Sequence, residues 1–533
     1  MAIDVVKIRR LFFELFWHVV VLAATVSVAS YFHGAPFWRV GDAIQPVYVL
    51  CVSYVALAVV LPITRYFKID GWLLPPAGFA AIGGLYFLWL LLSGGSYDKL
   101  DVLATFGLLA AAVSLFYLFP RFRLLWVGLF ATLLAGSVVM LLRPADDKAF
   151  EGDSASFVTS SIRTSVYDLE VRTYQGVVPR SRTHMGMGAL QKIEDAYVVA
   201  MASGEVYSIR GIGSMPSLSV KKWSNRAPLN YDDFLAAGEN QSFAIYFRVT
   251  DVLLKPGAQG NTLFVAHHHW NVDDACATLR VSSVAFDTLT QLEEEDLAWV
   301  TVFDTTPCFQ LEDEAWAFRG MEGGGRLALS SSDQLLLTVG DHGFNGVDYD
   351  TNWVDDLNTS YGKTIAIHLA SGESSVLTIG HRNQQGLLVD EDGIIWSTEH
   401  GPEGGDELNV LIQGGLYGWP NLTYGTDYGK LDWPVARPEE DSIYTLPVFA
   451  WLPAIGVSNL TVVRGSLFDR WESDLLVASL VAGTMYRVHI EDGAVRFVEP
   501  IRLNERIRDL VADDNGIIIW ADSRSLIQIV PDS

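Results

Sequence analysis

Basic residues are scarce in most of this chain. The first 145 residues hold ten Lys or Arg and six Asp or Glu, so of the totals of 37 basic and 62 acidic residues the remainder holds 27 and 56. A surface that binds nucleic acid or anionic lipid needs an excess of positive charge. The composition therefore excludes a nucleic-acid partner for residues beyond 145 and predicts a soluble, mutually repelling domain there.

Histidine and cysteine are also rare. The first 145 residues contain only His18 and His33, about four turns apart on one predicted helix and so at different depths, which excludes a bis-imidazole haem site. Of three cysteines, Cys51 lies in an apolar run, where a small buried side chain is the expected role. Cys276 and Cys308 lie beside strand-like stretches, and in an oxidising compartment we expect them to form a disulfide.

Long apolar runs are confined to the N-terminal part. Each of them is long enough to cross about 30 Å of hydrocarbon as a helix. They are residues 11–32, 44–63, 72–92, 102–119 and 124–142. The sequence therefore predicts a five-helix transmembrane domain over 1–145, followed by a linker over 146–160.

The basic residues of this part set its predicted orientation. They are concentrated before the first span and in every second loop: Lys7, Arg9, Arg10, Arg65, Lys68, Arg121 and Arg123. The positive-inside rule places these loops in the cytoplasm. After five crossings, residues 161–533 are expected to face the periplasm, with the chain in a bacterial inner membrane.

Six segments beyond residue 160 share a polar turn, a short apolar run and a small or polar exit. They are 203–209, 260–266, 332–340, 392–397, 473–479 and 514–520. Recurrence without a long helical period favours the blades of a propeller. An all-β six-bladed β-propeller is thus predicted, with a β-sandwich as the alternative.

The densest polar stretch consists of HRNQQG at 381–386, WSTEHGPEGGDELN at 396–409 and YGWP at 417–420. These motifs resemble those of the glucose/sorbosone dehydrogenase family, soluble-type aldose dehydrogenases that carry pyrroloquinoline quinone (PQQ) on a six-bladed propeller. The similarity extends from about residue 160 to 525. It implies oxidation of a sugar or related alcohol with PQQ and calcium. The membrane part is expected to act as an anchor; the alternative, for which no residue gives evidence, is that it also passes electrons from the propeller to a quinone.

The resemblance also implies roles for individual residues. Cofactor binding falls to Arg382, Asn383 and His400 in the central motif and to Arg506 and Arg508 near the C-terminus, since a guanidinium binds a carboxylate bidentately. The metal site falls to the Gly401 and Pro402 carbonyls and to Asp427, because calcium prefers oxygen ligands.

Two other polar groups have alternative interpretations. Asp406, Glu407 and Asp427, with the carbonyls of Thr423 and Gly425, are a further metal-binding or loop-ordering region, or solvated surface carboxylates. The run from His267 to His269 places at most two rings on one face of a strand, and we do not expect a metal there.

Three positions depart from the family pattern. Glu322 stands where the family has its catalytic histidine, four residues before the Arg of a Gly-Gly-Arg-Leu segment. Gly346 and Val481 stand where some members have a cofactor-contacting glutamine and lysine. Two hypotheses follow: Glu322 is itself the catalytic base, or the propeller is inactive and binds a sugar or other ligand as a sensor or scaffold.

Overall fold

The protein was examined as a computed structural model that describes residues 157–179, 186–213, 218–237, 244–258, 260–310, 320–331, 333–428, 432–433 and 443–532. All of these residues belong to one unit, Asp147–Ser533. The five predicted membrane spans lie outside the described residues. Within the described part, no helix is both long and apolar enough to cross a bilayer.

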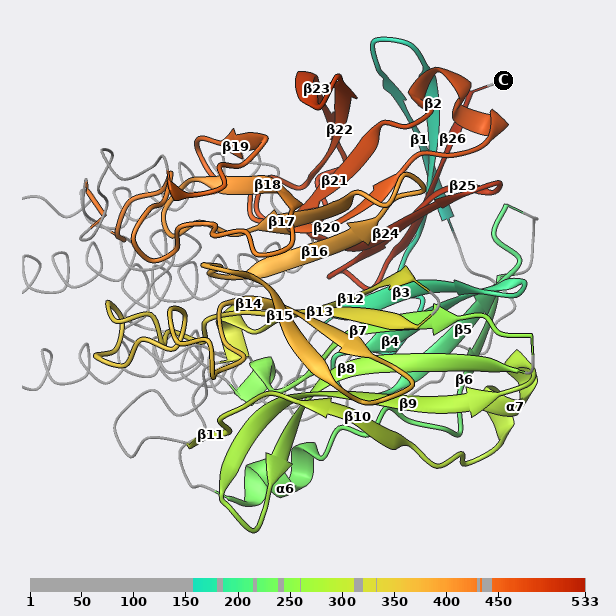
Figure 1. The fold of residues 1–533 in the computed structure, drawn as a ribbon. Coiled ribbons are helices and arrows are strands. Elements are labelled where there is room, and N and C mark those ends of the chain that lie inside the picture. The colour runs from blue at the N-terminus through green and yellow to red at the C-terminus, as the bar shows by residue number, and fades with distance from the viewer. Residues whose placement is uncertain are drawn as a thin grey trace, which may run out of the picture. The chain divides into compact units, whose positions relative to one another are not determined.

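Six antiparallel sheets surround a common axis, and their innermost strands gather near the middle of Figure 1. In each sheet, short runs of alternating or fully apolar residues form the strands, and Gly, Asn or Asp turns join them. The first four blades are β3–β6 (Gly188–Ile193, Ala196–Met201, Val206–Arg210, Ser219–Lys222), β7–β10 (Val249–Lys255, Asn261–Asn271, Cys276–Phe286, Val300–Asp304), β12–β15 (Gly324–Ser331, Gln334–Val339, Lys363–His368, Ser374–Ile379) and β16–β19 (Gln384–Val389, Ile395–Glu399, Asp406–Leu411, Phe449–Trp451).

The last blades complete the ring. The fifth is β20–β23 (Val457–Val462, Leu475–Ser479, Thr484–Glu491, Ala494–Arg502), and the sixth joins β24–β26 (Ile507–Asp513, Gly516–Ala521, Leu526–Pro531) to β2 (Asp168–Tyr174) and β1 (Phe157–Arg163). Because β2 pairs with β26 and β24 contacts β3, strands from both ends of this unit close the circle. The six-bladed propeller predicted from the repeats is confirmed.

Short elements lie between the strands. They are the helices α6 (Tyr231–Ala236) and α7 (Leu289–Glu294), the 3-10 turns η2 (Ala244–Tyr246), η3 (Gly320–Glu322) and η5 (Ser466–Trp471), and the two-residue strand β11 (Phe309–Gln310), which pairs with β9. The repeats do not all mark the same strand of a blade, and one boundary differs from the sequence prediction. Five of the six repeats are second strands of their blades, whereas 203–209 contains the third strand β5; and β1 begins at Phe157, inside the predicted linker.

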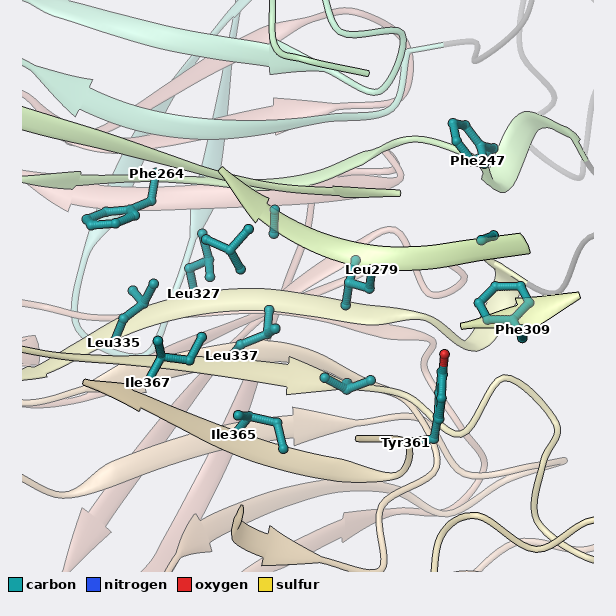
Figure 2. Close-up of a cluster of buried hydrophobic side chains, with 14 of the residues drawn as sticks. Phe247, Phe264, Leu279, Phe309, Leu327, Leu335, Leu337, Tyr361, Ile365 and Ile367 are labelled. Carbon is teal, nitrogen blue, oxygen red and sulfur yellow. The ribbon is translucent and has the colours of Figure 1, made fainter. Parts of the chain in front are cut away.

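Apolar side chains fill the space between neighbouring blades. Figure 2 shows the contact between the second and third blades, where Phe264 and Leu279 face Leu327, Leu335 and Leu337. Full burial of one such side chain contributes about 1.5 to 3 kcal/mol. This packing holds the blades in fixed positions, so the loops at their ends are held in fixed positions too.

The predicted disulfide is confirmed. Cys276 and Cys308 are bonded, with their Cα atoms 5.7 Å apart, and the bond ties the segment around β11 to the start of β9. The alternation predicted for the three consecutive histidines is confirmed as well. His267 and His269 lie on one face, with ring centroids 6.4 Å apart, while His268 packs against Phe247 and His342 on the other.

Irregular pairing recurs near the start of the inner strands. Register shifts of the β-bulge type occur in β7, β12, β16, β20 and β24. A bulge bends a strand and re-aims a side chain. In β12 the bulge includes Gly325, whose φ is +92° and whose Cβ, if present, would lie 2.2 Å from the Thr250 hydroxyl. The glycine run is therefore required by close packing.

These irregular turns place a buried arginine at the axis. Arg326 Nη1 lies 3.1 Å from both Asp251 Oδ1 and Asp509 Oδ2, and Arg326 also donates to the carbonyls of Gln385 and Arg508. Asp509 in turn accepts from the Leu190 backbone N–H at 2.8 Å and from Asn459 Nδ2 at 2.6 Å. All six inner strands therefore meet in one hydrogen-bonded network, directly below the loops that carry the predicted site.

Candidate functional site

The predicted site residues gather at one end of the propeller. The innermost strands of the six blades are β3, β7, β12, β16, β20 and β24, and the strands that follow each of them lie farther from the axis. The six inner strands are therefore parallel to one another, and their first residues surround one opening. Glu322 precedes β12, Arg382 and Asn383 precede β16, and Arg506 and Arg508 flank the first residue of β24. Residues almost two hundred positions apart are thus brought to the same opening, which we call the mouth.

Arg382 is the most heavily engaged of these residues. Its guanidinium is ion-paired with the Glu322 carboxylate, donates to the Gly401 carbonyl at 3.1 Å and lies 5.5 Å from the Trp419 ring centroid. Burial lowers the pKa of Arg382, but the carboxylates of Glu322 and Asp341 outweigh it and hold the pKa above its usual value. The buried Nε of Arg382 has no hydrogen-bond partner among the described residues, so one donor is left for a ligand.

A buried group behind Arg382 fixes its position. Glu399 accepts from the Arg382 backbone N–H and from His381 Nδ1, the latter at 2.8 Å. His381 Nε2 lies 2.9 Å from the Thr378 hydroxyl, and its ring stacks on Tyr417 at 4.6 Å. Both motifs, HRN and YGWP, therefore contribute to holding one guanidinium in place.

Glu322 lies at the end of η3, and its side chain is 21% exposed. Its Oε1 is ion-paired with Arg382, while Oε2 has no hydrogen-bond partner within the described part of the chain. The Glu322 carbonyl accepts from the His342 backbone N–H at 3.3 Å. The side chain expected to act as a base is thus at the mouth, with one carboxylate oxygen open to a substrate.

Asn383 ties two blades together. Its Oδ1 accepts from the Gly324 backbone N–H at 3.2 Å and from Gln385 Nε2 at 2.8 Å. The structure thereby connects the start of β16 to the start of β12, two residues after Glu322. The oxygen of this amide has a structural role, and the Nδ2 group is the part left to contact a ligand.

Arg506 and Arg508 converge on one carboxylate. Arg508 makes a bidentate pair with Asp522, at 2.5 and 2.9 Å, and Arg506 Nε lies 3.1 Å from Asp522 Oδ2. Burial opposes ionisation of Asp522, yet the charge of Arg508 lowers its pKa below the usual value. The Arg506 side chain is 51% exposed, so two positive charges and one negative charge face this side of the mouth.

The Gly-Pro step belongs to a loop that Asp406 orders. Asp406 Oδ2 accepts backbone N–H groups of Ile455, Gly456 and Val457 at 2.9, 2.6 and 3.1 Å, and its Oδ1 accepts from Gly401 at 3.3 Å. The loop-ordering interpretation of Asp406 is therefore confirmed. His400 lies beside it, with Nδ1 3.9 Å from Asp406 Oδ1, and burial lowers the pKa of His400.

A small pocket lies between this loop and the YGWP segment. Arg382, His400, Gly401, Glu407 and Thr423 are among its lining residues. Glu407 stands opposite Glu399 in the β17–β18 ladder; burial, and then the charge of Glu399, raise the pKa of Glu407 to about 8. Two residues of the predicted second metal region, Glu407 and Thr423, therefore share one pocket.

Asp427, the third predicted metal residue, lies in the loop that pairs with this region. Glu403 and Thr426 exchange backbone hydrogen bonds at 2.9 Å, which brings the Asp427 segment alongside the Gly401–Pro402 turn. Among the described residues, no cluster of three or more His, Cys, Asp or Glu side chains is arranged to hold a metal. A metal at this loop would therefore depend on carbonyl oxygens.

Sequence reasoning missed three residues of the mouth. Asp341 is fully buried and accepts from Trp419 Nε1 at 2.6 Å; burial, and then the charge of Glu322, raise its pKa well above the usual range. Asp522 holds the C-terminal arginine pair, and Arg248 lies directly before β7. None of them stands in a recognisable motif. The Gly340-Asp341 step, which directly follows β13, is the sequence signal that could have pointed to Asp341.

Of the three positions that depart from the family pattern, Glu322 lies at the mouth, and the other two are Val481 and Gly346. Val481 is 74% exposed and supplies no charge. Gly346 adopts a φ of +79° in a turn where its amide donates to the Thr351 carbonyl.

Comparisons with known proteins agree with this geometry. The model of the family described as Glucose / Sorbosone dehydrogenase matches residues 249–529. The chain is 26% identical over 305 residues to the aldose sugar dehydrogenase YliI of Escherichia coli, covering 53% of this chain and 76% of that protein. It is 25% identical over 278 residues to quinoprotein glucose dehydrogenase B of Acinetobacter calcoaceticus, covering 37% of this chain and 57% of that protein.

The chain spans only about half of the length, 52%, of another curated relative that it matches. Among solved structures, the soluble aldose sugar dehydrogenase of Escherichia coli in its apo form superposes with a TM-score of 0.52 and 22% identity, covering 68% of this chain and all of that one. This likeness supports the six-bladed fold. Since the family model covers more than half of the sequence, the chain belongs to the glucose/sorbosone dehydrogenase family.

Proposed function

We propose that the propeller is a dehydrogenase that oxidises a sugar or related alcohol and uses PQQ as its cofactor. The observation that carries the proposal is the convergence of Arg382, Glu322, Arg506 and Arg508 at the mouth. Relatives with the printed names aldose sugar dehydrogenase and quinoprotein glucose dehydrogenase support the reaction class.

The residues present fit a flat cofactor that carries carboxylates. Arg382 is preorganised by Glu399 and has one unused N–H, and Arg508, held by Asp522, adds a second fixed guanidinium at the mouth. A fixed guanidinium binds a carboxylate with both charge and geometry. When bound, the quinone would supply the acceptor for the hydride of the substrate.

Glu322 would act as the base. Oxidation of a hydroxyl requires that its proton be removed as the hydride leaves, and the free Oε2 of Glu322 can accept it. Arg382 holds Glu322 through Oε1 and leaves Oε2 without a hydrogen-bond partner in the described part of the chain. His400 lines the adjacent pocket and would form part of the substrate or cofactor wall.

Calcium would bind at the Gly401 and Pro402 carbonyls, with Asp427 in the neighbouring segment. Carbonyl oxygens are suitable ligands for this ion. The Gly401 oxygen already accepts from Arg382, so a divalent cation there would be repelled by the guanidinium unless an anion lay between them. A carboxylated cofactor would provide that anion, which predicts that calcium and PQQ bind cooperatively.

The test uses the purified full-length protein with PQQ and calcium. Bound quinone is followed by its absorption, and turnover by sugar-dependent dye reduction. Glu322→Gln should lower turnover by about 10² to 10⁴ while PQQ stays bound, because a positioned general base contributes about that much. Glu294→Gln, an exposed glutamate on α7, is the matched control and should leave turnover unchanged.

Two other outcomes of this experiment would contradict the proposed dehydrogenase. Quinone binding without turnover in the wild type, unchanged by Glu322→Gln, would instead identify a ligand-binding propeller that acts as a sensor or scaffold. The absence of quinone binding in the wild type would refute the proposed cofactor.

We also propose that residues 1–145 anchor the propeller to the bacterial inner membrane, facing the periplasm, with a membrane quinone as electron acceptor. Five apolar runs and the basic loops between them support this topology. A periplasm-active reporter fused after residue 145 should be active. A reporter active only in the cytoplasm would contradict the orientation.

A further inference from the structure

Arg248 lies at the mouth but belongs to none of the motifs discussed above. It directly precedes the inner strand β7, in the position that Arg382 and Asn383 occupy before β16. Its backbone carbonyl accepts from the His268 backbone N–H at 3.0 Å, which fixes the strand start. Its Nη1 lies 3.7 Å from Met187 Sδ, so the side chain extends toward the start of β3, the blade next to β24.

Arg248 differs from every other buried arginine of the described residues. Three of the four are ion-paired with a carboxylate: Arg326 with Asp251 and Asp509, Arg382 with Glu322, and Arg487 with Asp474. Arg248 is only 8% exposed, has no ion-pair partner in the described part of the chain, and its Nε has no hydrogen-bond partner there. A buried cation without an anion is unfavourable.

The surrounding charges do not compensate the buried charge of Arg248. Burial, and then the positive charge of Arg508, lower the pKa of Arg248 to about 10. The carboxylate that raises the pKa of Arg248, Asp522, is already bonded to Arg506 and Arg508. Arg506 and Arg508 therefore already use the carboxylate of Asp522, and Arg248 has no ion-pair partner of its own among the described residues.

We propose that Arg248 is an anion-binding residue that, together with Arg508, receives a carboxylate of the cofactor. The carboxylate of the ligand would be the ion-pair partner that Arg248 lacks within the described residues. Glu322 is the corresponding partner of Arg382. This inference rests on the proposed function only in taking the tricarboxylate quinone as the ligand; the site itself would accept a carboxylate of any bound polyanion.

The experiment compares full-length wild type with Arg248→Met, Arg248→Lys and Arg496→Met, the last being a half-exposed arginine on β23 as matched control. PQQ affinity is measured by quenching of tryptophan fluorescence, with the PQQ trimethyl ester as the uncharged probe. Arg248→Met should weaken PQQ binding about ten- to hundredfold, the value of a charge-assisted bond, and leave ester binding unchanged. Arg248→Lys keeps the positive charge but lacks the two parallel donors of the guanidinium. Its PQQ affinity should lie between those of the wild type and Arg248→Met.

Thermal stability without ligand separates this role from a structural one. If Arg248 waits for an anion, Arg248→Met should unfold at the same temperature as the wild type or higher, because an unpaired buried charge is removed. A lower unfolding temperature together with unchanged PQQ affinity would overturn the proposal, as would an equal loss of ester binding. If Arg248→Met does not fold, unchanged PQQ affinity in Arg248→Lys would overturn it.

Failure of the proposed function can be told apart from failure of this inference. If the wild type binds no PQQ, the cofactor assignment fails, and citrate then serves as the probe of the anion site. Stabilisation of the wild type by citrate that is absent in Arg248→Met would sustain the site. Citrate stabilisation that is equal in both proteins, or absent from both, would overturn it.

Discussion

The axial arginine provides the sharpest test of how this propeller is held together. Arg326→Met keeps the length of the side chain but leaves Asp251 and Asp509, both almost fully buried, without their shared counterion. Removing one partner of a buried ion pair costs about 3 to 5 kcal/mol, because the other charge stays buried. We expect a loss of that size in the free energy of unfolding at pH 7.

The two carboxylates should respond differently to this loss. Asp509 keeps donors from Leu190, Asn459 and its own neighbour Leu510, at 2.6 to 2.8 Å. Asp251 keeps the Leu327 backbone N–H at 2.8 Å, and burial already raises its pKa to about 6 while Arg326 lowers it. Without Arg326, the pKa of Asp251 rises further, so we expect Asp251 to be the residue that takes up a proton.

This gives the destabilisation a defined pH dependence. A carboxylate whose pKa is raised by folding contributes stability below its unfolded pKa near 4, and that contribution is lost as the pH rises through the folded pKa. Because the folded pKa of Asp251 is higher in Arg326→Met, the variant loses this stability over a wider pH range than the wild type does. The difference between variant and wild type should therefore shrink by roughly 1 kcal/mol when the pH is lowered from 7 to 5.

Urea unfolding of the full-length protein, followed by tryptophan fluorescence, measures these differences. Adding Asp251→Asn to Arg326→Met should restore part of the loss, because the unpaired charge is removed. Arg280→Met, which breaks the more exposed pair with Asp304, should cost about 1 kcal/mol or less. The reasoning is refuted if Arg326→Met lies within about 1 kcal/mol of the wild type, or if the second substitution makes it worse.

Three further predictions concern other parts of the propeller. Burial lowers the pKa of His267 to about 4, so stability should fall by about 3 kcal/mol as the pH drops from 6.5 toward 4, and His267→Gln should flatten this dependence in unfolding curves. Replacing Cys276 and Cys308 by alanine should cost about 3 to 4 kcal/mol, since the bond closes a 32-residue separation; a reducing agent should lower wild-type stability equally. Asp406→Asn should expose the 401–405 loop to limited proteolysis, and an unchanged cleavage pattern would contradict its role as a clamp.

Much of the fold could be predicted because the blade is a local unit. A turn residue followed by a short apolar run marks one strand of each blade, and six such runs gave the right number of blades. The segment 203–209 marks the third strand of its blade, β5, although the second strand, β4, is also apolar and follows a Glu-Asp turn. The pattern alone does not say which of two neighbouring apolar strands is the inner one.

The arginines with a motif could be predicted, but their partners could not. Arg382, Arg506 and Arg508 were singled out from the sequence, and the structure places them at the mouth with Glu322, while their cofactor-binding role stays a prediction. Asp522 and Asp341 became partners only because separate loops fold over the same opening. Such contacts join residues 14 to 78 positions apart, and no short-range pattern encodes them.

The sequence by itself determined the blade count and the motifs that identify the family, because each depends on local periodicity or on a contiguous run of residues. It also predicted the cysteine pair, since Cys276 and Cys308 are the two cysteines beyond residue 160. Only the tertiary structure decided that Arg326 links all six inner strands, and that Arg248 is buried without a carboxylate beside Arg508. The reason is electrostatic: the state of a charged side chain depends on which charges surround it in space. In a closed ring of blades those neighbours come from every part of the chain.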